Sequence, residues 1–201
     1  MRGVEQIPWL YDGLCAVMER TGLAPFRRWI AAGARGRTLD VGCGTGRGLR
    51  FYGPGTSVVG IDPARDSLAR AARRVPGSRL VQANAEALPF RDRIFDTVVS
   101  SFVFCSVPDP ARGLAEVKRV LRPDGQLRML EHVRSRRRWK AAFQDRVQPL
   151  WTRLSGGCRP NRETERLVEA SGFVIDRADR LDQADLRRFS ARPASGRRPP
   201  G

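Results

Sequence analysis

Short apolar runs alternate with amphipathic segments from about residue 36 onward. The amphipathic segments have apolar side chains at helical spacing, and turn residues separate them from the runs. This alternation predicts an α/β fold, a Rossmann-like doubly wound and mostly parallel sheet with helices on both faces. The expected strands are residues 38–41, 57–61, 79–82, 97–101, 126–131 and 173–175, and the expected helices are 64–74, 110–121 and 162–171.

Two segments and the C-terminus lie outside this alternation. Residues 1–35 predict an N-terminal helical lid, with helical stretches on either side of Pro25. Residues 139–154 have apolar side chains near helical spacing and a kink at Pro149, a pattern more typical of core than of a substrate-facing or membrane-facing helix. After residue 175 little strand character remains, so we expect the C-terminal strand pair to be truncated, divergent or replaced by a charged helix at about 183–189.

These patterns give the expected organisation of the chain. It consists of a lid (1–35), one ligand-binding domain (36–180) with a substrate-side insertion (139–160), and a basic, largely disordered tail (181–201). The insertion is also the best candidate for a substrate-facing lid.

The composition is that of an ordinary globular protein, with 41% hydrophobic and 29% charged residues among 201. No apolar stretch approaches the roughly 18 to 20 residues of a membrane-spanning helix, and the first residues lack a signal-peptide core, so we expect a cytoplasmic protein. The cysteines are widely separated and form no CxxC pair, which argues against a metal site and favours packed, reduced thiols. They are Cys15, Cys43, Cys105 and Cys158.

The formal net charge of +16 comes almost wholly from arginine. Arginines scattered along a chain are usually solvated surface, although a basic field also attracts nucleic acid, anionic lipid or acidic substrates. One cluster is denser, residues 134–138 (RSRRR), and it is followed by Trp139. This cluster beside an amphipathic segment could rest on anionic headgroups, as a peripheral membrane contact.

The most informative stretch is TLDVGCGTGRG, residues 38–48, where glycines alternate directly after a predicted strand. A P-loop needs Lys and then Ser or Thr after its last glycine, and a dinucleotide fingerprint needs glycine where Arg47 stands. Asp40 ends the strand and suits an ammonium group better than a phosphate. Asp62 ends the second strand, where a carboxylate can accept both ribose hydroxyl protons. A cationic adenosine that carries an amino acid meets these requirements, and S-adenosylmethionine is such a ligand.

On these and further motifs, the chain resembles class I S-adenosylmethionine-dependent methyltransferases, in the group with phospholipid N-methyltransferases, methyltransferase-like 7 thiol methyltransferases and quinone C-methyltransferases. The resemblance covers about residues 9–175 and leans towards the phospholipid and methyltransferase-like 7 branch. The motifs are LDVGCGTG (39–46), VVGIDP (58–63), ANAEALPF (83–90), FDTVVSSFVFCSVPDP (95–110), EVKRVLRPDGQL (116–127), LEHV (130–133) and GGCRPNRETERLVEASGF (156–173).

The resemblance implies a set of cofactor-binding residues. It places the methionine end at Asp40, Gly42, Gly44, Thr45 and Gly46, the ribose at Asp62, the adenine at Asn84 and Ala85, and the sulfonium near Ser101. Asn84 stands where many relatives have aspartate, and Asn84 and Ser101 are equally explained by turn chemistry at strand ends. Tyr11 and Asp12 match a position on a lid over the cofactor.

Methyl transfer from a sulfonium is an in-line displacement, so a base is needed only where the acceptor must lose a proton. The sole histidine, His132, follows the fifth predicted strand and could act as a base or orient the acceptor; a strand cap or a packing role is the alternative. The expected acceptor is a small lipophilic molecule: a phospholipid amine, a quinone-like ring or a thiol.

Two other functions stay open at this stage. A nucleic-acid methyltransferase lacks support because no Asn-Pro-Pro-aromatic motif follows the fourth predicted strand and no RNA-binding module is present. A non-catalytic S-adenosylmethionine-binding protein would be consistent with the divergent C-terminus.

Overall fold

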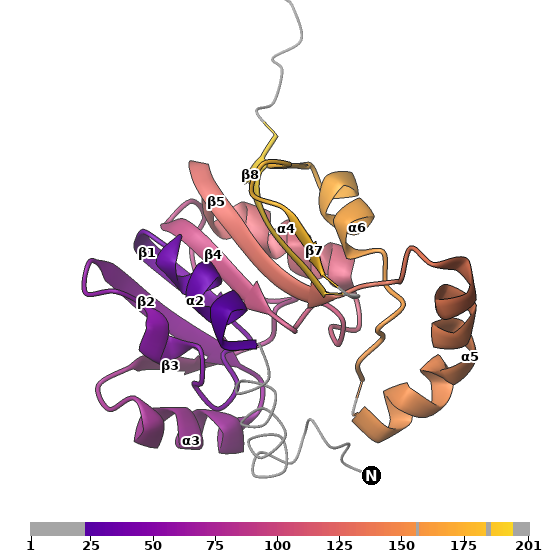
Figure 1. Ribbon diagram of the computed structural model, residues 1–201. Helices are drawn as coiled ribbons and strands as arrows, with labels where there is room; N and C mark the ends of the chain where they lie inside the picture. Colours follow the sequence, from indigo (N-terminus) through magenta and orange to yellow (C-terminus); the bar gives the residue numbers. More distant parts are fainter. Residues whose placement is uncertain (1–22, 156, 184–185, 195–201) are drawn as a thin grey trace, which may run out of the picture.

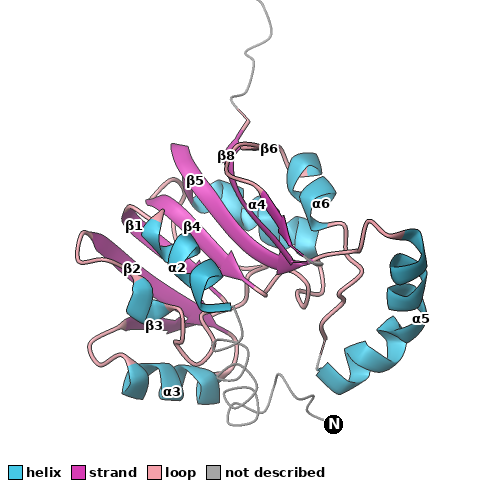
Figure 2. Cartoon of the chain, in the orientation of Figure 1, coloured by secondary structure: helices cyan, strands magenta, loops and turns pink. Residues whose placement is uncertain are grey.

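The computed structural model describes residues 23–155, 157–183 and 186–194, which form a single mixed sheet flanked by helices (Figures 1 and 2). The strands are β1 (Gly36–Val41), β2 (Thr56–Asp62), β3 (Arg79–Gln82), β4 (Phe95–Ser101), β5 (Leu121–His132), β6 (Phe173–Ile175), β7 (Leu181–Gln183) and β8 (Leu186–Pro193). The helices are α2 (Ala24–Ala32), the short 3-10 helix η3 (Leu49–Phe51), α3 (Arg65–Arg74), α4 (Pro110–Val120), α5 (Arg138–Ser155) and α6 (Thr164–Ala170).

The strand order is β3-β2-β1-β4-β5-β8-β6, with β7 paired to β8. The first five strands in this order are parallel, and β8 runs antiparallel to both β5 and β6. The doubly wound, mostly parallel fold predicted from the sequence is therefore confirmed. The order reverses between β1 and β4, and ligands bind to such sheets outside the carboxyl ends of the strands at that point.

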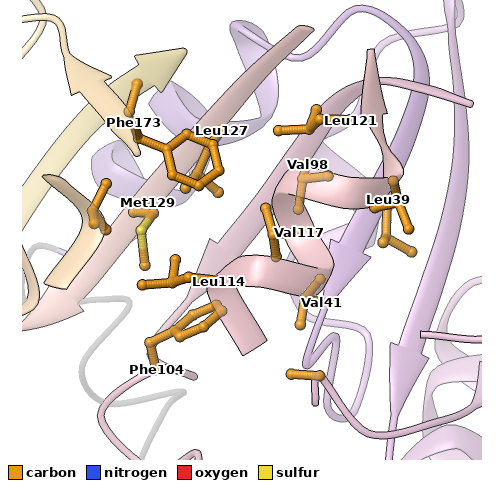
Figure 3. Packing of buried hydrophobic residues seen from close by; sticks show 14 of the residues in the cluster. Leu39, Val41, Val98, Phe104, Leu114, Val117, Leu121, Leu127, Met129 and Phe173 are labelled. Carbon is orange, nitrogen blue, oxygen red and sulfur yellow. The ribbon is translucent and has the colours of Figure 1, made fainter. Parts of the chain in front are cut away.

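The core lies between the sheet and α4 (Figure 3). Asp109 caps α4 by accepting a hydrogen bond from the Arg112 N–H, and Pro110 occupies its first turn. Leu114 and Val117 then lie on one face and pack against Val98 and Leu127 of the strands, all fully buried. Leu114 and Val117 thus hold β4 and β5 against α4.

The helix α2 falls within the segment predicted as a lid, and it packs on the sheet. Phe26 and Ile30 form a second core with Leu130. The Arg128 guanidinium lies 4.0 Å from the ring centre of Trp29 and donates to the Trp29 carbonyl. This part of the segment thus belongs to the body of the domain.

Of the alternatives expected for the C-terminus, a truncated strand pair and a charged helix at about 183–189 are wrong. β8 pairs with β5 over six residues, from Leu127↔Ala191 to His132↔Leu186, and Phe189 and Ala191 are fully buried. The arginines of β8 concealed the strand pattern because charged side chains are typical of solvated surface. They are tolerated in the strand because they are paired: Arg187 forms ion pairs with Glu165 and Asp182. The prediction of a disordered tail over 181–201 is likewise wrong for β7 and β8.

The helix expected at 139–154 is confirmed as α5, but its apolar residues do not enter the core. Figure 1 shows α5 standing away from the sheet. Its exposed large apolar side chains are Trp139 (68%), Phe143 (61%), Leu150 (63%), Trp151 (49%) and Leu154 (56%). Among the residues described, no helix is long and apolar enough to cross a membrane.

Candidate functional site

A cavity that is partly open to solvent lies at the carboxyl ends of β1 and β4, where the strand order reverses. It brings together five of the predicted cofactor residues with four that were not predicted. The lining consists of Arg27, Asp40, Gly42, Cys43, Gly44, Thr45, Arg47, Gly48 and Ser101.

The glycine loop needs glycines for two different reasons. Gly44 has φ +55°, and a Cβ there would meet only the Gly42 carbonyl, at 4.0 Å, so the loop is bare towards the cavity. Gly46 has φ +77°, and a Cβ there would come within 2.9 Å of the Ala71 backbone in α3. Gly44 thus leaves space for a ligand, whereas Gly46 permits close packing of α3 and does not line the cavity.

Asp40 is buried at the end of β1 and accepts a hydrogen bond of 3.0 Å from the Tyr52 hydroxyl. Burial raises the pKa of Asp40 from 3.8 to about 7, while Tyr52 and the charge of Arg27 act in the opposite direction. The carboxyl is therefore easily protonated until a cation enters the cavity. Tyr52 and Arg27 were missed in the sequence because neither lies in a recognised motif.

Asp62 holds the glycine loop to the end of β2. Its carboxylate accepts the Gly44 N–H at 3.0 Å and the Ala64 N–H at 2.8 Å. Burial raises its pKa, and these two hydrogen bonds oppose the increase. Asp62 therefore fixes the loop as well as standing where a ribose acceptor is expected.

Ser101 lies at the end of β4 and lines the cavity. Its buried hydroxyl oxygen has no hydrogen-bond partner among the residues described. A buried orphan hydroxyl is costly unless a ligand or water satisfies it. Together with the bare Gly44 backbone and two carboxylates, it fits a cationic nucleoside ligand such as S-adenosylmethionine.

The remaining predicted cofactor residues lie further away. Asn84 is exposed after β3 and forms an isolated bridge with Ala87, while Ala85 is buried. Neither lines the cavity, so their assignment to adenine stays a prediction. Tyr11 and Asp12 lie outside the described residues.

His132 ends β5 at the same edge of the sheet, with its ring 4.7 Å from that of Phe102. The structure brings it together with Cys105 and Cys158, whose ligand atoms and that of His132 all lie within 4.8 Å of one another. The sequence predicted packed, reduced thiols, and both cysteines are free and buried, but their proximity to His132 was not predicted. Spacing could not reveal the cluster, because its members come from three separate segments.

The pKa values of the two thiols are shifted in opposite directions. A hydrogen bond from Cys105 lowers the pKa of Cys158, and hydrogen bonds from His132 and Trp151 lower it further. The same contact with Cys158, together with burial, raises the pKa of Cys105. Cys158 therefore carries the thiolate character of the pair.

Glu131 is a fully buried carboxylate that the sequence did not single out as functional. It accepts the backbone N–H groups of Val103, Phe104 and Cys105 at 3.1 to 3.3 Å and the Ser100 hydroxyl at 2.9 Å. Burial raises its pKa, against the effect of these hydrogen bonds. Glu131 thus fixes the loop after β4, which carries Cys105 and faces His132.

Comparisons with known proteins agree with this geometry. A family model described as a methyltransferase domain matches residues 39–129. The human thiol S-methyltransferase TMT1A is 37% identical over 173 residues, which cover 82% of this chain and 70% of the relative. The phosphatidylethanolamine N-methyltransferase of Cereibacter sphaeroides is 41% identical over 117 residues, covering 54% of this chain and 58% of the relative.

Solved structures show the same fold. The S-adenosylmethionine-dependent methyltransferase from Mesorhizobium loti superimposes with a TM-score of 0.66 at 21% identity, covering 85% of this chain and 97% of that protein. The chain spans 59% to 70% of the length of the thiol methyltransferases that it matches.

Proposed function

The chain belongs to the S-adenosylmethionine-dependent methyltransferase family, and we propose that it transfers the methyl group of this cofactor to a small lipophilic thiol. The observation that supports S-adenosylmethionine as the methyl donor is the cavity at the reversal of strand order, which is lined by Asp40, Gly44 and Ser101. The thiol acceptor is supported by the human thiol methyltransferase, which covers 82% of this chain, against 54% for the phospholipid methyltransferase.

Residues of the cavity, together with Asp62, which accepts the Gly44 N–H, would each bind a different part of the cofactor. Asp40 would attract the ammonium group, the bare Gly44 backbone would lie against the nucleoside, and Asp62 would accept the ribose hydroxyl groups. When bound, S-adenosylmethionine supplies an electrophilic methyl group on a sulfonium. Ser101 lines the cavity at the end of β4, beside the loop that faces His132, so the methyl group would point along this edge of the sheet.

His132 marks the acceptor end of this site. It is half-buried and in contact with Phe102, so a small acceptor can reach one side of its imidazole from solvent. For in-line transfer, the chain must hold the acceptor atom in contact with the methyl carbon and exclude water. His132 would orient the acceptor or take its proton.

The decisive experiment measures transfer of radiolabelled methyl groups to an alkyl thiol, phosphatidylethanolamine, a quinone-like phenol and RNA, with products separated by solvent partition. We expect label in the thiol. His132→Ala should lower turnover at least roughly tenfold while calorimetric affinity for the cofactor stays unchanged. Label in RNA alone, or cofactor binding without transfer to any acceptor, would contradict the proposal.

The acceptor would be collected at an anionic membrane surface. Five large apolar side chains of α5 are exposed, and residues 134–138, four of them arginine, directly precede them or begin the helix. Apolar side chains beside a basic cluster bind interfaces through burial and attraction to anionic headgroups. The proposed membrane-facing surface consists of Trp139, Phe143, Leu150 and Leu154.

The two other functions considered from the sequence are less well supported. The reading as a non-catalytic binding protein rested on a missing C-terminal strand, and β8 is present and paired. A nucleic-acid substrate is favoured by no specific contact surface among the described residues, because many arginines of the sheet are engaged in ion pairs, such as Arg187 with Glu165 and Asp182.

A further inference from the structure

Three potential metal ligands meet at the acceptor end of the site. Cys105 comes from the loop after β4, His132 from the end of β5, and Cys158 from the loop after α5. Their ligand atoms all lie within 4.8 Å of one another. In a tetrahedral zinc site, bond lengths of about 2.0 to 2.3 Å place neighbouring ligand atoms roughly 3.5 to 3.8 Å apart. The ligand atoms of the cluster would need to approach one another by roughly 1.3 Å at most.

The two cysteine loops are tied together independently of their thiols. The Arg159 N–H donates to the Cys105 carbonyl at 2.8 Å. The Arg162 guanidinium donates to the Phe104 and Val107 carbonyls at 2.5 and 2.6 Å, and its own carbonyl accepts the Arg134 N–H beyond β5 at 3.1 Å. The segment 159–162 therefore connects all three ligand-bearing elements.

Each cysteine is further fixed at its own backbone. The Cys105 N–H donates to Glu131 at 3.3 Å. The Cys158 N–H donates to the Ser155 hydroxyl at 3.2 Å, and the Cys158 carbonyl accepts the Thr152 hydroxyl at 3.0 Å. Metal sites with a catalytic role depend on such supporting hydrogen bonds, which hold the ligands in place before the metal arrives.

The cluster is closed on its cysteine sides and open on its histidine side. Cys105 and Cys158 are 1% and 2% exposed, whereas His132 is half-buried. A site with three protein ligands and an accessible fourth position is the arrangement of catalytic zinc, whereas structural zinc has four protein ligands. Two thiolates and one imidazole select zinc over magnesium or calcium, which prefer oxygen ligands.

We propose that Cys105, His132 and Cys158 bind a Zn²⁺ ion whose open position takes the acceptor thiol as a thiolate. The second half of this proposal rests on the proposed function, while the zinc site itself does not. The acceptor thiol releases its proton to solvent when its sulfur binds zinc. A lone pair of that sulfur then attacks the methyl carbon of the donor, a new carbon–sulfur bond forms, and the electron pair of the broken carbon–sulfur bond stays on the donor sulfur. The products are a methyl thioether and S-adenosylhomocysteine.

The position of the cluster next to the cofactor cavity is consistent with methyl transfer to a thiol bound at the metal. The Ser101 side chain lines the cofactor cavity, and the next residue, Phe102, contacts the His132 ring. The backbone N–H of Phe102 donates to Leu130 at 2.7 Å, which joins the ends of β4 and β5. The cavity and the cluster are therefore neighbours along one edge of the sheet. The role of His132 in this arrangement is that of a ligand that orients the acceptor.

The first test measures metal content. The full chain is purified under reducing conditions, stripped with chelator, reloaded with zinc and analysed by elemental mass spectrometry. We expect about one zinc per chain, lost in Cys105→Ser and in Cys158→Ser and retained in Cys43→Ser, whose thiol lines the cofactor cavity and is not part of the cluster. Circular dichroism, which does not depend on cofactor binding, shows that each variant is folded. Zinc that is absent from the wild type, or retained in both cluster variants, would overturn the proposal.

The second test uses cobalt in place of zinc. Co²⁺ bound by two thiolates should give intense sulfur-to-cobalt charge-transfer absorption and tetrahedral visible bands. An alkyl thiol should shift this spectrum, and an alcohol of the same chain length should not. An unshifted spectrum would overturn acceptor binding at the metal even if methyl transfer to thiols occurs. Full thiol methylation by metal-free enzyme would likewise overturn the catalytic role and leave the proposed function intact. A Cys105–Cys158 disulfide, two mass units lighter, with no metal uptake after reduction would overturn the site.

Discussion

We expect Asp40 to couple cofactor binding to pH, because burial raises the pKa of its carboxyl from 3.8 to about 7. Between about pH 4 and 7 the folded chain holds this group protonated while the unfolded chain ionises it, so this residue lowers stability as pH rises through that window. A cationic ligand favours the carboxylate. We therefore expect the affinity for S-adenosylmethionine, measured by calorimetry, to fall below pH 7 by up to about tenfold per pH unit.

The matched variant is Asp40→Asn, which keeps the shape of the side chain and an acceptor for the Tyr52 hydroxyl. Its cofactor affinity should be lower than that of the wild type near pH 7.5 and nearly constant down to about pH 5.5. A wild-type affinity that does not change over this range would show that Asp40 does not sense the ammonium group.

Asp62 gives a second prediction at the residue scale. Asp62→Asn leaves one acceptor oxygen for two backbone N–H groups, those of Gly44 and Ala64, and removes the charge that would accept the ribose hydroxyls. Charge-assisted hydrogen bonds are worth about 1.5 to 3 kcal/mol, so cofactor affinity by calorimetry should fall about 10- to 100-fold. Asp124→Asn is the control, since Asp124 is exposed near the start of β5, at the opposite edge. Equal affinities for the two variants would refute the assignment.

Individual site residues were predictable where one motif holds them. Asp40 and Ser101 lie at strand ends and Gly44 follows one, and the carboxyl ends of parallel strands meet at one edge, so their convergence follows from the pattern. Arg27 and Glu131 have no such signal, because their roles depend on how α2 and the loop after β4 pack. The Cys105, His132 and Cys158 cluster was missed for the same reason, since three segments must fold before it exists.

At the scale of elements, we predict that substitutions in the core of β8 strongly lower the free energy of unfolding. Phe189 is fully buried opposite Met129 of β5. Phe189→Ala should lower the free energy of unfolding by about 3 to 5 kcal/mol, because it leaves a cavity in the core. Arg192→Ala, at an exposed position of the same strand, should change it by less than about 0.5 kcal/mol. Urea unfolding distinguishes them, and equally small effects would mean that β8 does not complete the sheet.

The strands and helices of the parallel half were predictable from alternation alone, and two C-terminal features show where that reasoning ends. Arginines made β8 resemble a solvated tail, but Arg187 is paired with Glu165 and Asp182, and Arg188 lies 4.8 Å over the Trp29 ring. In α5 the helical period was correct, yet periodicity reports an apolar face and not what covers it. Only tertiary placement showed that face to be exposed.

The exposed face of α5 leads to a prediction about membranes. Phe143→Ser with Leu150→Ser should reduce the fraction bound to anionic vesicles about tenfold or more, since both side chains would otherwise enter the interface. Val174→Ser is the control, because Val174 of β6 is as exposed, at 61% against 61% for Phe143. Co-sedimentation measures the effect, and circular dichroism checks the helix. If Val174→Ser reduced vesicle binding as much as the double variant, α5 would not be the membrane-binding surface.

For the molecule as a whole, the sheet places the three features to which we assign functions along one edge. The cofactor cavity lies at the ends of β1 and β4, the Cys105, His132 and Cys158 cluster follows at the end of β5, and α5 begins a few residues later. We therefore expect a lipophilic acceptor held at the α5 surface to enter from the side of the cluster.

The net charge of +16 makes this approach dependent on salt. Each basic residue near an anionic surface contributes about 1 kcal/mol, and this contribution is screened within a Debye length of roughly 10 Å at 0.1 M salt. Arg137→Gln with Arg138→Gln, beside the α5 surface, should weaken vesicle binding roughly 30-fold at low salt and little near 1 M. Arg91→Gln with Arg93→Gln removes the same charge from exposed positions before β4, at the opposite edge, and should have a much smaller effect. Equal losses in the two double variants would indicate attraction by the overall field, and equal recovery with neutral vesicles would refute anionic binding.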